Sequence, residues 1–158
     1  SAHVSWAPEM CIRDRGSNTI SGGVPNAESY RMETYTVYVQ LVCDASYTVV
    51  IPADVGVGWG RTDRVEAGSL KVENLFIPTT ASVEVGVTSE NEFKMIHNSF
   101  ALPYRYQTGD LKDFRGDTFN MSTTDLEREL YVEVPNWSGA PSDQYKDTLT
   151  FTVTYHEP

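Results

Sequence analysis

The sequence predicts an all-β protein folded as an antiparallel β-sandwich. Branched and aromatic residues alternate with polar residues in one run after another, and a period of two is typical of half-buried strands. Turn-forming residues separate these runs at roughly the 8–12-residue spacing of sandwiches and barrels. Parallel strands would need helical crossovers, which the sequence does not offer, so the sheets should be antiparallel. Two sheets packed face to face, of the Ig-like or the jelly-roll type, satisfy these observations.

The stretch over residues 34–52 contains the longest alternating run, at residues 34–43, and we expect the later strands to pack on this stretch. Five side chains fall on its expected core face: Tyr35, Val37, Val39, Leu41 and Cys43. A break at Asp44-Ala45 precedes a second strand over residues 46–51. Pro52 ends that strand, because proline has no N–H to donate to a β-ladder.

Seven further runs predict the remaining strands. They cover residues 69–77, 81–88, 92–97, 102–106, 119–121, 130–134 and 147–155. Pro103 places the run over residues 102–106 at a sheet edge. The one helical signal is a single turn over residues 123–130, where Thr124 and Glu127 have the spacing of a capping box.

The chain divides into an arm and a domain. Residues 1–29 predict a flexible N-terminal arm or linker, since the glycine- and serine-rich stretch 16–26 is typical of loops. Residues 30–158 then form one β-sandwich domain, long enough to bury a core without a disulfide. Residues 10–15, Met-Cys-Ile-Arg-Asp-Arg, resemble the translation of an adaptor used for sequencing libraries. That resemblance implies a metagenomic gene and a non-native segment 1–15.

The charge of the chain excludes some partners. The formal net charge is −10, from 22 acidic and 12 basic residues. Such a surface repels phosphate backbones and anionic lipids, so we expect no nucleic-acid partner. No stretch approaches the ~18 apolar residues of a membrane helix, so we expect no membrane insertion. No signal peptide is visible, which leaves a cytosolic protein or a mature secreted one. The abundance of Thr, Ser, Tyr, Val and Gly favours secretion.

The sequence offers no catalytic signature. It has three histidines, and neither a Gly-x-Ser-x-Gly elbow nor a glycine-rich phosphate loop. We therefore expect a protein that is not an enzyme and that uses no cofactor. Cys11 and Cys43 permit one disulfide, within or between subunits, although a buried free thiol is the simpler interpretation of Cys43.

Two loops are candidate partner-binding sites. Trp59 lies in the glycine-rich stretch 56–60, where flanking glycines let the backbone approach a partner closely. Arg115, Gly116 and Asp117 match the tripeptide of some integrin ligands, and we expect them in an exposed turn. An acidic cluster surrounds that loop, formed by Asp110, Asp113 and Asp117; a solvated loop is a better interpretation than a metal site. Further candidates for a sugar-binding face beside Trp59 are Tyr104, Tyr106, Trp137 and Tyr145.

Three stretches together resemble a known family. Residues 46–53, Ser-Tyr-Thr-Val-Val-Ile-Pro-Ala, resemble the "SYTVTIPA" strand of secreted β-sandwich surface proteins of gut Firmicutes. Residues 68–78 are similar to the strand that follows in that family, and residues 146–155 to its "GTLTFTV" terminal strand, with the Trp-Ser-Gly turn at 137–139 before it. The resemblance, which covers residues 34–156, implies a WxL-like or pilin-like protein at the bacterial cell surface.

These observations lead to three hypotheses of function. The first is a structural subunit of a pilus-like or other filament, in which residues 1–29 add a strand to a neighbouring subunit's sheet. The second is an adhesin domain that binds a glycan or a host protein through Trp59, the tyrosines and the loop over residues 107–119. The third is a viral capsid or decoration domain, because sandwich folds do not decide function.

Overall fold

The structure is a computed structural model, and it describes residues 2–6, 15–24, 31–40 and 44–158, with side chains from residue 44 onward. These residues form strands, turns and loops and contain no helix, and their sheets are antiparallel throughout. The predicted all-β, antiparallel fold class is therefore confirmed. No helix able to cross a membrane occurs in these ranges.

The chain forms two compact units. Unit 1 comprises residues 1–7 and 45–158, and unit 2 comprises residues 8–44. The boundary that we expected after residue 29 falls inside unit 2.

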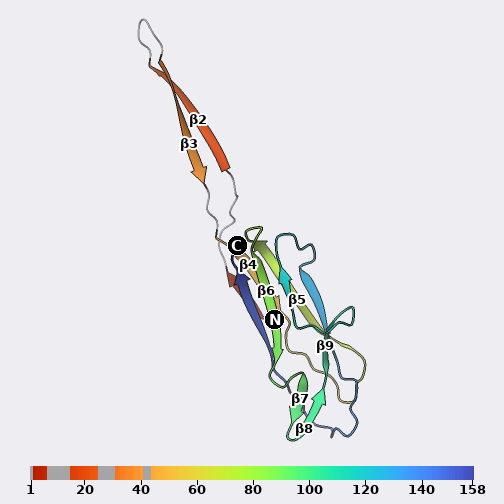
Figure 1. Cartoon of the computed structure of the whole chain (residues 1–158). Helices are drawn as coiled ribbons and strands as arrows, with labels where there is room; N and C mark the ends of the chain where they lie inside the picture. The colour runs from red at the N-terminus through yellow and green to blue at the C-terminus, as the bar shows by residue number, and fades with distance from the viewer. Residues whose placement is uncertain (1, 7–14, 25–30, 41–43) are drawn as a thin grey trace. The chain divides into compact units, whose positions relative to one another are not determined.

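Unit 2 contains a two-stranded sheet. Strands β2 (Arg15–Val24) and β3 (Arg31–Gln40) pair over ten residues each, from Arg15 opposite Gln40 to Val24 opposite Arg31 (Figure 1). The prediction of a strand from residue 34 is confirmed as far as residue 40. The prediction that later strands pack on the stretch 34–52 is wrong for its first half, because β3 pairs with β2 in a sheet of its own. The second half, residues 46–51, does pair with a later strand in the five-stranded sheet of unit 1. The prediction of a loop over residues 16–26 is wrong for residues 16–24, which form β2. Glycine and serine are typical of loops, and here pairing with β3 holds them in an extended conformation.

Unit 1 contains two larger sheets and one hairpin. The five-stranded sheet has the order β1 (Ala2–Trp6), β4 (Ser46–Ile51), β5 (Val65–Phe76), β11 (Glu127–Glu133) and β9 (Arg105–Thr108). The three-stranded sheet has the order β10 (Gly116–Phe119), β6 (Ser82–Ser89) and β12 (Leu149–His156). The hairpin joins β7 (Lys94–His97) to β8 (Phe100–Pro103). Pro103 thus lies in a two-stranded hairpin, as its missing N–H requires.

The two sheets of unit 1 share one hydrophobic core. Val49, Leu70 and Leu130 enter it from the five-stranded sheet, and Val83 and Phe119 enter it from the three-stranded sheet, all fully buried. Strand β6 shows the predicted alternation, with every second residue from 83 to 87 buried. Because side chains of both sheets fill the same interior, the sheets cover each other as in a sandwich.

Residues 120–126 form turns, so the predicted helical turn is wrong. The Thr123 N–H donates to the Asn120 carbonyl at 3.0 Å, and the Asn120 side chain accepts the Ser122 N–H at 2.9 Å. An asparagine that bonds the backbone two residues on competes with a helical start. The Val72 N–H already bonds the Leu126 carbonyl at 2.8 Å, which leads the chain into β11.

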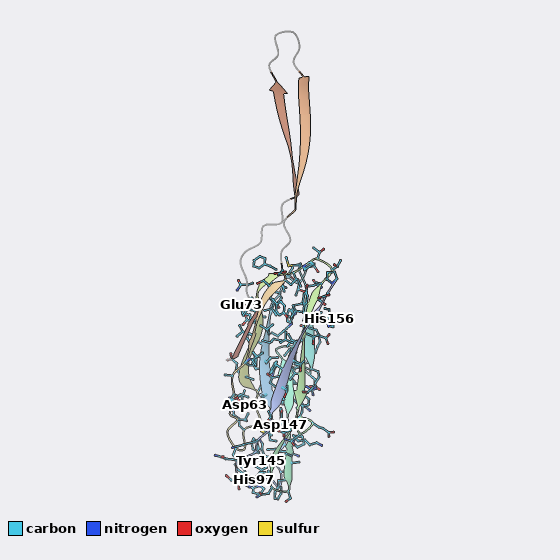
Figure 2. All side chains as sticks on the ribbon, turned by 90° about the vertical axis from the view of Figure 1, so that its left-hand side faces the viewer. Asp63, Glu73, His97, Tyr145, Asp147 and His156 are labelled. Carbon is cyan, nitrogen blue, oxygen red and sulfur yellow. The ribbon has the colours of Figure 1, made fainter. Side chains whose placement is uncertain are left out.

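Three connecting segments meet at one end of unit 1. They are residues 52–64 between β4 and β5, the β7–β8 hairpin, and residues 135–148 between β11 and β12. Ile96 and Lys146 exchange backbone hydrogen bonds of 2.8 and 3.1 Å, which tie the third segment to the hairpin. Figure 2 shows His97 and Tyr145 together at this end, with Glu73 and His156 toward the opposite end. We call the surface formed by these three segments the loop end.

Candidate ligand-binding surface

Trp59 is presented at the loop end by a tight turn. The Arg61 N–H donates to the Gly58 carbonyl at 3.1 Å, and Gly60 has a φ of +79°, which marks the third position of a type II turn. The Trp59 indole N–H donates to the Pro141 carbonyl at 3.1 Å. The side chain is therefore held at its backbone and at its indole nitrogen, although 54% of the residue is exposed.

Trp137 is held in a similar way in the segment between β11 and β12. The Ala140 N–H donates to the Trp137 carbonyl at 3.0 Å, and Gly139 has a φ of +76°, so this turn is also of type II. The Trp137 indole N–H donates to the Arg61 carbonyl at 2.8 Å. Each tryptophan thus bonds the segment that carries the other, and the two loops hold each other in place.

The two indole rings form a tilted pair. Their centroids lie 6.0 Å apart and their planes meet at 59°, within the range that aromatic pairs prefer. Both indole N–H groups are used in hydrogen bonds to backbone carbonyls. The pair therefore offers carbon surface to a ligand, and a ligand gains no hydrogen bond from either indole.

A planar ion pair lies beside the tryptophans. Arg61 donates its Nε–H and one Nη2–H to the two carboxylate oxygens of Asp63, each at 2.8 Å. Such a fork fixes both groups in one plane. Because both side chains are at least half exposed, the pair adds little to folding stability. Its value lies in presenting donors and acceptors in fixed positions.

Tyr145 and His97 also belong to the surface of the loop end. The Tyr145 hydroxyl donates to the Pro141 carbonyl at 3.0 Å, the same carbonyl that Trp59 uses. The His97 ring packs edge to face on Tyr145 at 5.8 Å, and its Nδ1 lies 3.0 Å from the Gln144 carbonyl. Since a carbonyl only accepts, Nδ1 carries the hydrogen. Nε2 lies 3.0 Å from the side-chain amide nitrogen of Asn98 and 2.9 Å from the Asp143 carboxylate.

Asp147 anchors this end to the sheets. Its carboxylate accepts the Ser89 hydroxyl at 2.6 Å, the Tyr104 hydroxyl at 2.5 Å, and the backbone and side-chain N–H groups of Asn91 at 3.2 and 3.0 Å. These donors come from the end of β6, the following turn and the residue after β8. One carboxylate therefore fixes the third loop segment against both the small sheet and the hairpin.

The structure separates the predicted sugar-face aromatics into two groups. Trp59, Trp137 and Tyr145 converge at the loop end through Pro141 and the ring pair. Tyr104 and Tyr106 are buried in the core, so their placement on a sugar-binding face is wrong. Both follow the alternation of core residues, which the period of two already favoured.

No local pattern in the sequence indicates the polar residues of this surface. Arg61, Asp63, His97 and Asp143 are common surface types at uninformative spacings. Only the turns and the pairing of loops bring them beside the aromatic rings.

The turn expected for Arg115, Gly116 and Asp117 is wrong, although Arg115 and Gly116 are exposed as expected. Gly116 begins strand β10 and lies opposite Gly86 of β6. Its φ is +153°, and a Cβ built on it would lie 2.6 Å from the Val85 carbonyl oxygen, so glycine is needed for close strand contact.

Both charged side chains of this tripeptide are used within the protein. The Arg115 guanidinium lies 3.5 Å from the centre of the Phe93 ring and donates to the Phe114 carbonyl at 2.9 Å. The Asp117 carboxylate accepts Nε of Arg128 at 2.6 Å. The close approach of β6 therefore explains the glycine, and internal pairs explain its charged neighbours.

The acidic cluster is neutralised locally. Asp110 pairs with Lys112 at 2.7 Å, and hydrogen bonds from Lys112 and Thr108 lower the Asp110 pKa to about 2. Asp113 lies 3.8 Å from Arg115. Among the residues whose side chains are described, no group of three or more His, Cys, Asp or Glu is arranged to hold a metal ion.

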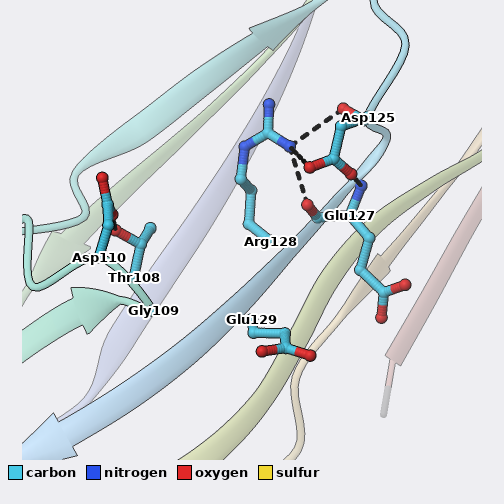
Figure 3. A pocket seen from close by; sticks show the side chains of 7 residues that line it. All are labelled: Thr108, Gly109, Asp110, Asp125, Glu127, Arg128 and Glu129. Atoms are coloured by element: carbon cyan, nitrogen blue, oxygen red, sulfur yellow. Dashed lines mark hydrogen bonds and ion pairs between the residues drawn. The ribbon is translucent and has the colours of Figure 1, made fainter.

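An open pocket of about 360 Å³ lies beside this cluster (Figure 3). It is lined by Thr108, Gly109, Asp110, Asp125, Glu127, Arg128 and Glu129. Arg128 bridges its wall, donating to the backbone carbonyls of Asp125 and Glu127 at 3.0 and 2.8 Å. The pocket is acidic apart from this arginine, whose bonds are internal, and it contains none of the aromatic residues of the loop end.

Cys11 and Cys43 lie outside the described residues, so the predicted disulfide stays a prediction. Comparison of the chain with protein-family models, with curated proteins and with solved structures gives no match. The resemblance to secreted surface proteins of gut Firmicutes likewise stays a prediction.

Proposed function

We propose that the protein is a secreted adhesin domain of the bacterial cell surface, which binds a glycan or a host protein through its loop end. The observation that carries this proposal is the state of Trp59, which is more than half exposed and yet fixed by a turn and an indole hydrogen bond. Water-exposed tryptophan surface that is already ordered is typical of binding hot spots. Its burial by a ligand releases water at little further cost in side-chain entropy.

The surroundings of Trp59 favour recognition over a purely structural role. A tryptophan that served only to close the loop would bury its ring, because each Å² of apolar surface removed from water contributes about 25 cal/mol. Instead, the loop uses the indole nitrogen and leaves the ring face open. The Arg61–Asp63 fork and the His97–Asp143 pair supply polar groups at the same loop end.

Binding is tested on an array that carries bacterial, plant and host glycans together with host extracellular proteins. We expect the full-length protein to bind at least one class, and the Trp59→Ala variant to lose that binding. Phe76→Ala is the matched control, because Phe76 is 53% exposed but lies on β5, at the opposite end from the loop end. Equal binding by the Trp59→Ala variant and the wild type would remove the loop end as the site.

A second function, the filament subunit, is favoured by the pairing of β1. Residues 2–6 add to the free side of β4 at the edge of the five-stranded sheet, from Ala2 opposite Ile51 to Trp6 opposite Tyr47. The same ladder formed with the β4 strand of a second copy would link subunits head to tail, and a contact that does not close generates a fibre. Residues 2–6 fall in the segment 1–15 whose non-native origin the adaptor resemblance of residues 10–15 implies, which places this proposal second.

Negative-stain electron microscopy of the full-length protein tests the filament. Regular fibres that disappear when residues 1–29 are removed would support strand addition by the arm. Isolated particles at every protein concentration would contradict it.

A further inference from the structure

We infer that the ligand of the loop end is a neutral carbohydrate, with a sugar ring stacked on the exposed face of Trp59. This inference rests on the proposed binding function and names its ligand class. Four observations carry it: the carbon-only aromatic surface, the tilt of the ring pair, the fixed polar fork and the sign of the charge.

The aromatic surface matches the C–H face of a sugar ring. The π-face of an indole is negative, so it attracts the weakly positive hydrogens on the apolar face of a pyranose. The indole nitrogens of Trp59 and Trp137 are committed to Pro141 and Arg61, so a partner that relied on an indole N–H would find none. A sugar needs only the ring face.

The geometry of the pair suits a small ring. The two indoles are tilted by 59° and centred 6.0 Å apart, so their faces do not form one flat platform. Trp137 is partly buried against the core, and Trp59 is the exposed member of the pair. A single sugar ring is small enough to stack on Trp59 alone, whereas a wide planar ligand would find no platform of matching width.

Arg61 and Asp63 supply complementary polar groups in the segment that carries Trp59. The fork uses Nε and Nη2 of Arg61, and the Nη1 hydrogens of Arg61 make no hydrogen bond within the described part of the chain. The Asp63 oxygens keep lone pairs beyond those that Arg61 uses. A sugar hydroxyl both donates and accepts, so neighbouring hydroxyls are able to bond Arg61 and Asp63 together. Because Arg61 and Asp63 already hold each other in one plane, a ligand that binds them loses little further side-chain entropy.

Charge excludes acidic glycans. The guanidinium of Arg61 at the loop end is already paired with Asp63, and the whole chain carries a net charge of −10. A sulfated or uronic-acid polymer would be repelled before contact, because like charges raise the energy of encounter.

The small amount of exposed apolar surface at the loop end disfavours a protein partner. Stable protein interfaces bury about 800 Å² on each side, around an apolar centre. Among the residues whose burial is described, the large exposed apolar side chains are scattered: Val55, Trp59, Phe76, Phe100, Leu111 and Met121. Only Val55, Trp59 and Phe100 belong to the loop end. One ring with polar neighbours suits a sugar better than a protein surface.

The test uses the full-length protein on one array. Its members are neutral oligosaccharides derived from glucans, mannans and galactans, their sulfated or uronic-acid counterparts, and host extracellular proteins. We expect binding to at least one neutral family and none to the charged counterparts. Titration calorimetry with the bound oligosaccharide should show at least a tenfold loss of affinity for Trp59→Ala. The Trp59→Phe variant, which keeps an aromatic face, should lose less, and Phe76→Ala should match the wild type.

The outcomes separate the ligand class from the site. Binding to proteins alone, lost in Trp59→Ala, would refute the carbohydrate and leave the binding function standing. Neutral-glycan binding that survives Trp59→Ala would refute the site. Binding to nothing on the array would refute both. Thermal unfolding of each variant shows whether a loss of binding reflects a loss of folding.

Discussion

Replacement of Asp147 by alanine should strongly destabilise unit 1. The carboxylate accepts four hydrogen bonds, from Ser89, Tyr104 and two groups of Asn91. A hydrogen bond to a charged group contributes about 1.5–3 kcal/mol, and these bonds share one acceptor and are not additive. Tyr104 is only 8% exposed, so its partly buried hydroxyl would lose this charged acceptor. We expect a loss of about 3–4 kcal/mol in the free energy of unfolding.

Thermal unfolding followed by circular dichroism measures this loss. For a chain of this length, 1 kcal/mol corresponds to roughly 2–4 °C, so the melting temperature should fall by about 6–16 °C. Asp54→Ala is the matched control, because Asp54 is exposed and no contact is described for it, and it should stay within about 0.5 kcal/mol of the wild type. If the Asp147→Ala and Asp54→Ala variants have the same melting temperature, the Asp147 network does not stabilise the fold as proposed.

The same network predicts a dependence on pH. Burial raises the pKa of the Asp147 carboxyl, but hydrogen bonds from Ser89, Tyr104 and Asn91 oppose it and leave the pKa below its ordinary value. A lowered folded-state pKa means stability that is fully present above the unfolded pKa, near 3.9, and that is lost as pH falls through the folded value. The Asp147→Asn variant lacks this titration. The difference in melting temperature between wild type and Asp147→Asn should therefore be constant near neutrality and shrink below about pH 4.

Three further predictions concern single residues. Gly116→Ala should lower the free energy of unfolding by about 2 kcal/mol, because the new Cβ would lie 2.6 Å from the Val85 carbonyl oxygen. Gly86→Ala on the paired strand is the control, since a Cβ there has open space, and chemical denaturation compares the two variants. Gly60→Ala places a side chain at a φ of +79°, which costs about 1–2 kcal/mol and should weaken ligand binding by displacing the Trp59 turn, as calorimetry would show. Phe119→Ala should cost about 3–5 kcal/mol because Phe119 is fully buried, while Phe76→Ala should leave the midpoint of denaturation nearly unchanged.

The strands of unit 1 were predictable because each carries its own pattern. In β6, three valines alternate with Glu84 and Gly86, and one buried face produces that alternation whatever the partner strand is. The strand β2 was not predictable, since Gly22 and Gly23 are typical of loops and only the ten-residue ladder with β3 makes them extended. The helical turn failed for a related reason: Asn120 closes local turns that the capping-box spacing does not show.

The candidate site was predictable only in part. Glycines on both sides of Trp59 indicated a presented ring, and Gly60 indeed supplies the positive φ of the turn. The meeting of Trp59 with Trp137 depends on a hydrogen bond across 76 residues, between the Trp137 indole and the Arg61 carbonyl. Nothing local in either segment encodes that contact. The turn predicted at residues 115–117 was wrong because the sequence does not distinguish a glycine needed for close strand contact from a glycine needed for a turn.

Nuclear magnetic resonance of the indole N–H signals tests the loop end most directly. The chain has three tryptophans, so full-length protein should give three indole resonances, assigned by single replacements. On addition of a neutral oligosaccharide selected from the array, the Trp59 and Trp137 signals should shift in a saturable manner, and the signal of Trp6, which belongs to β1, should stay in place. A bound oligosaccharide that leaves the Trp59 and Trp137 signals unchanged would show that the ligand binds elsewhere and that the loop end is not the site.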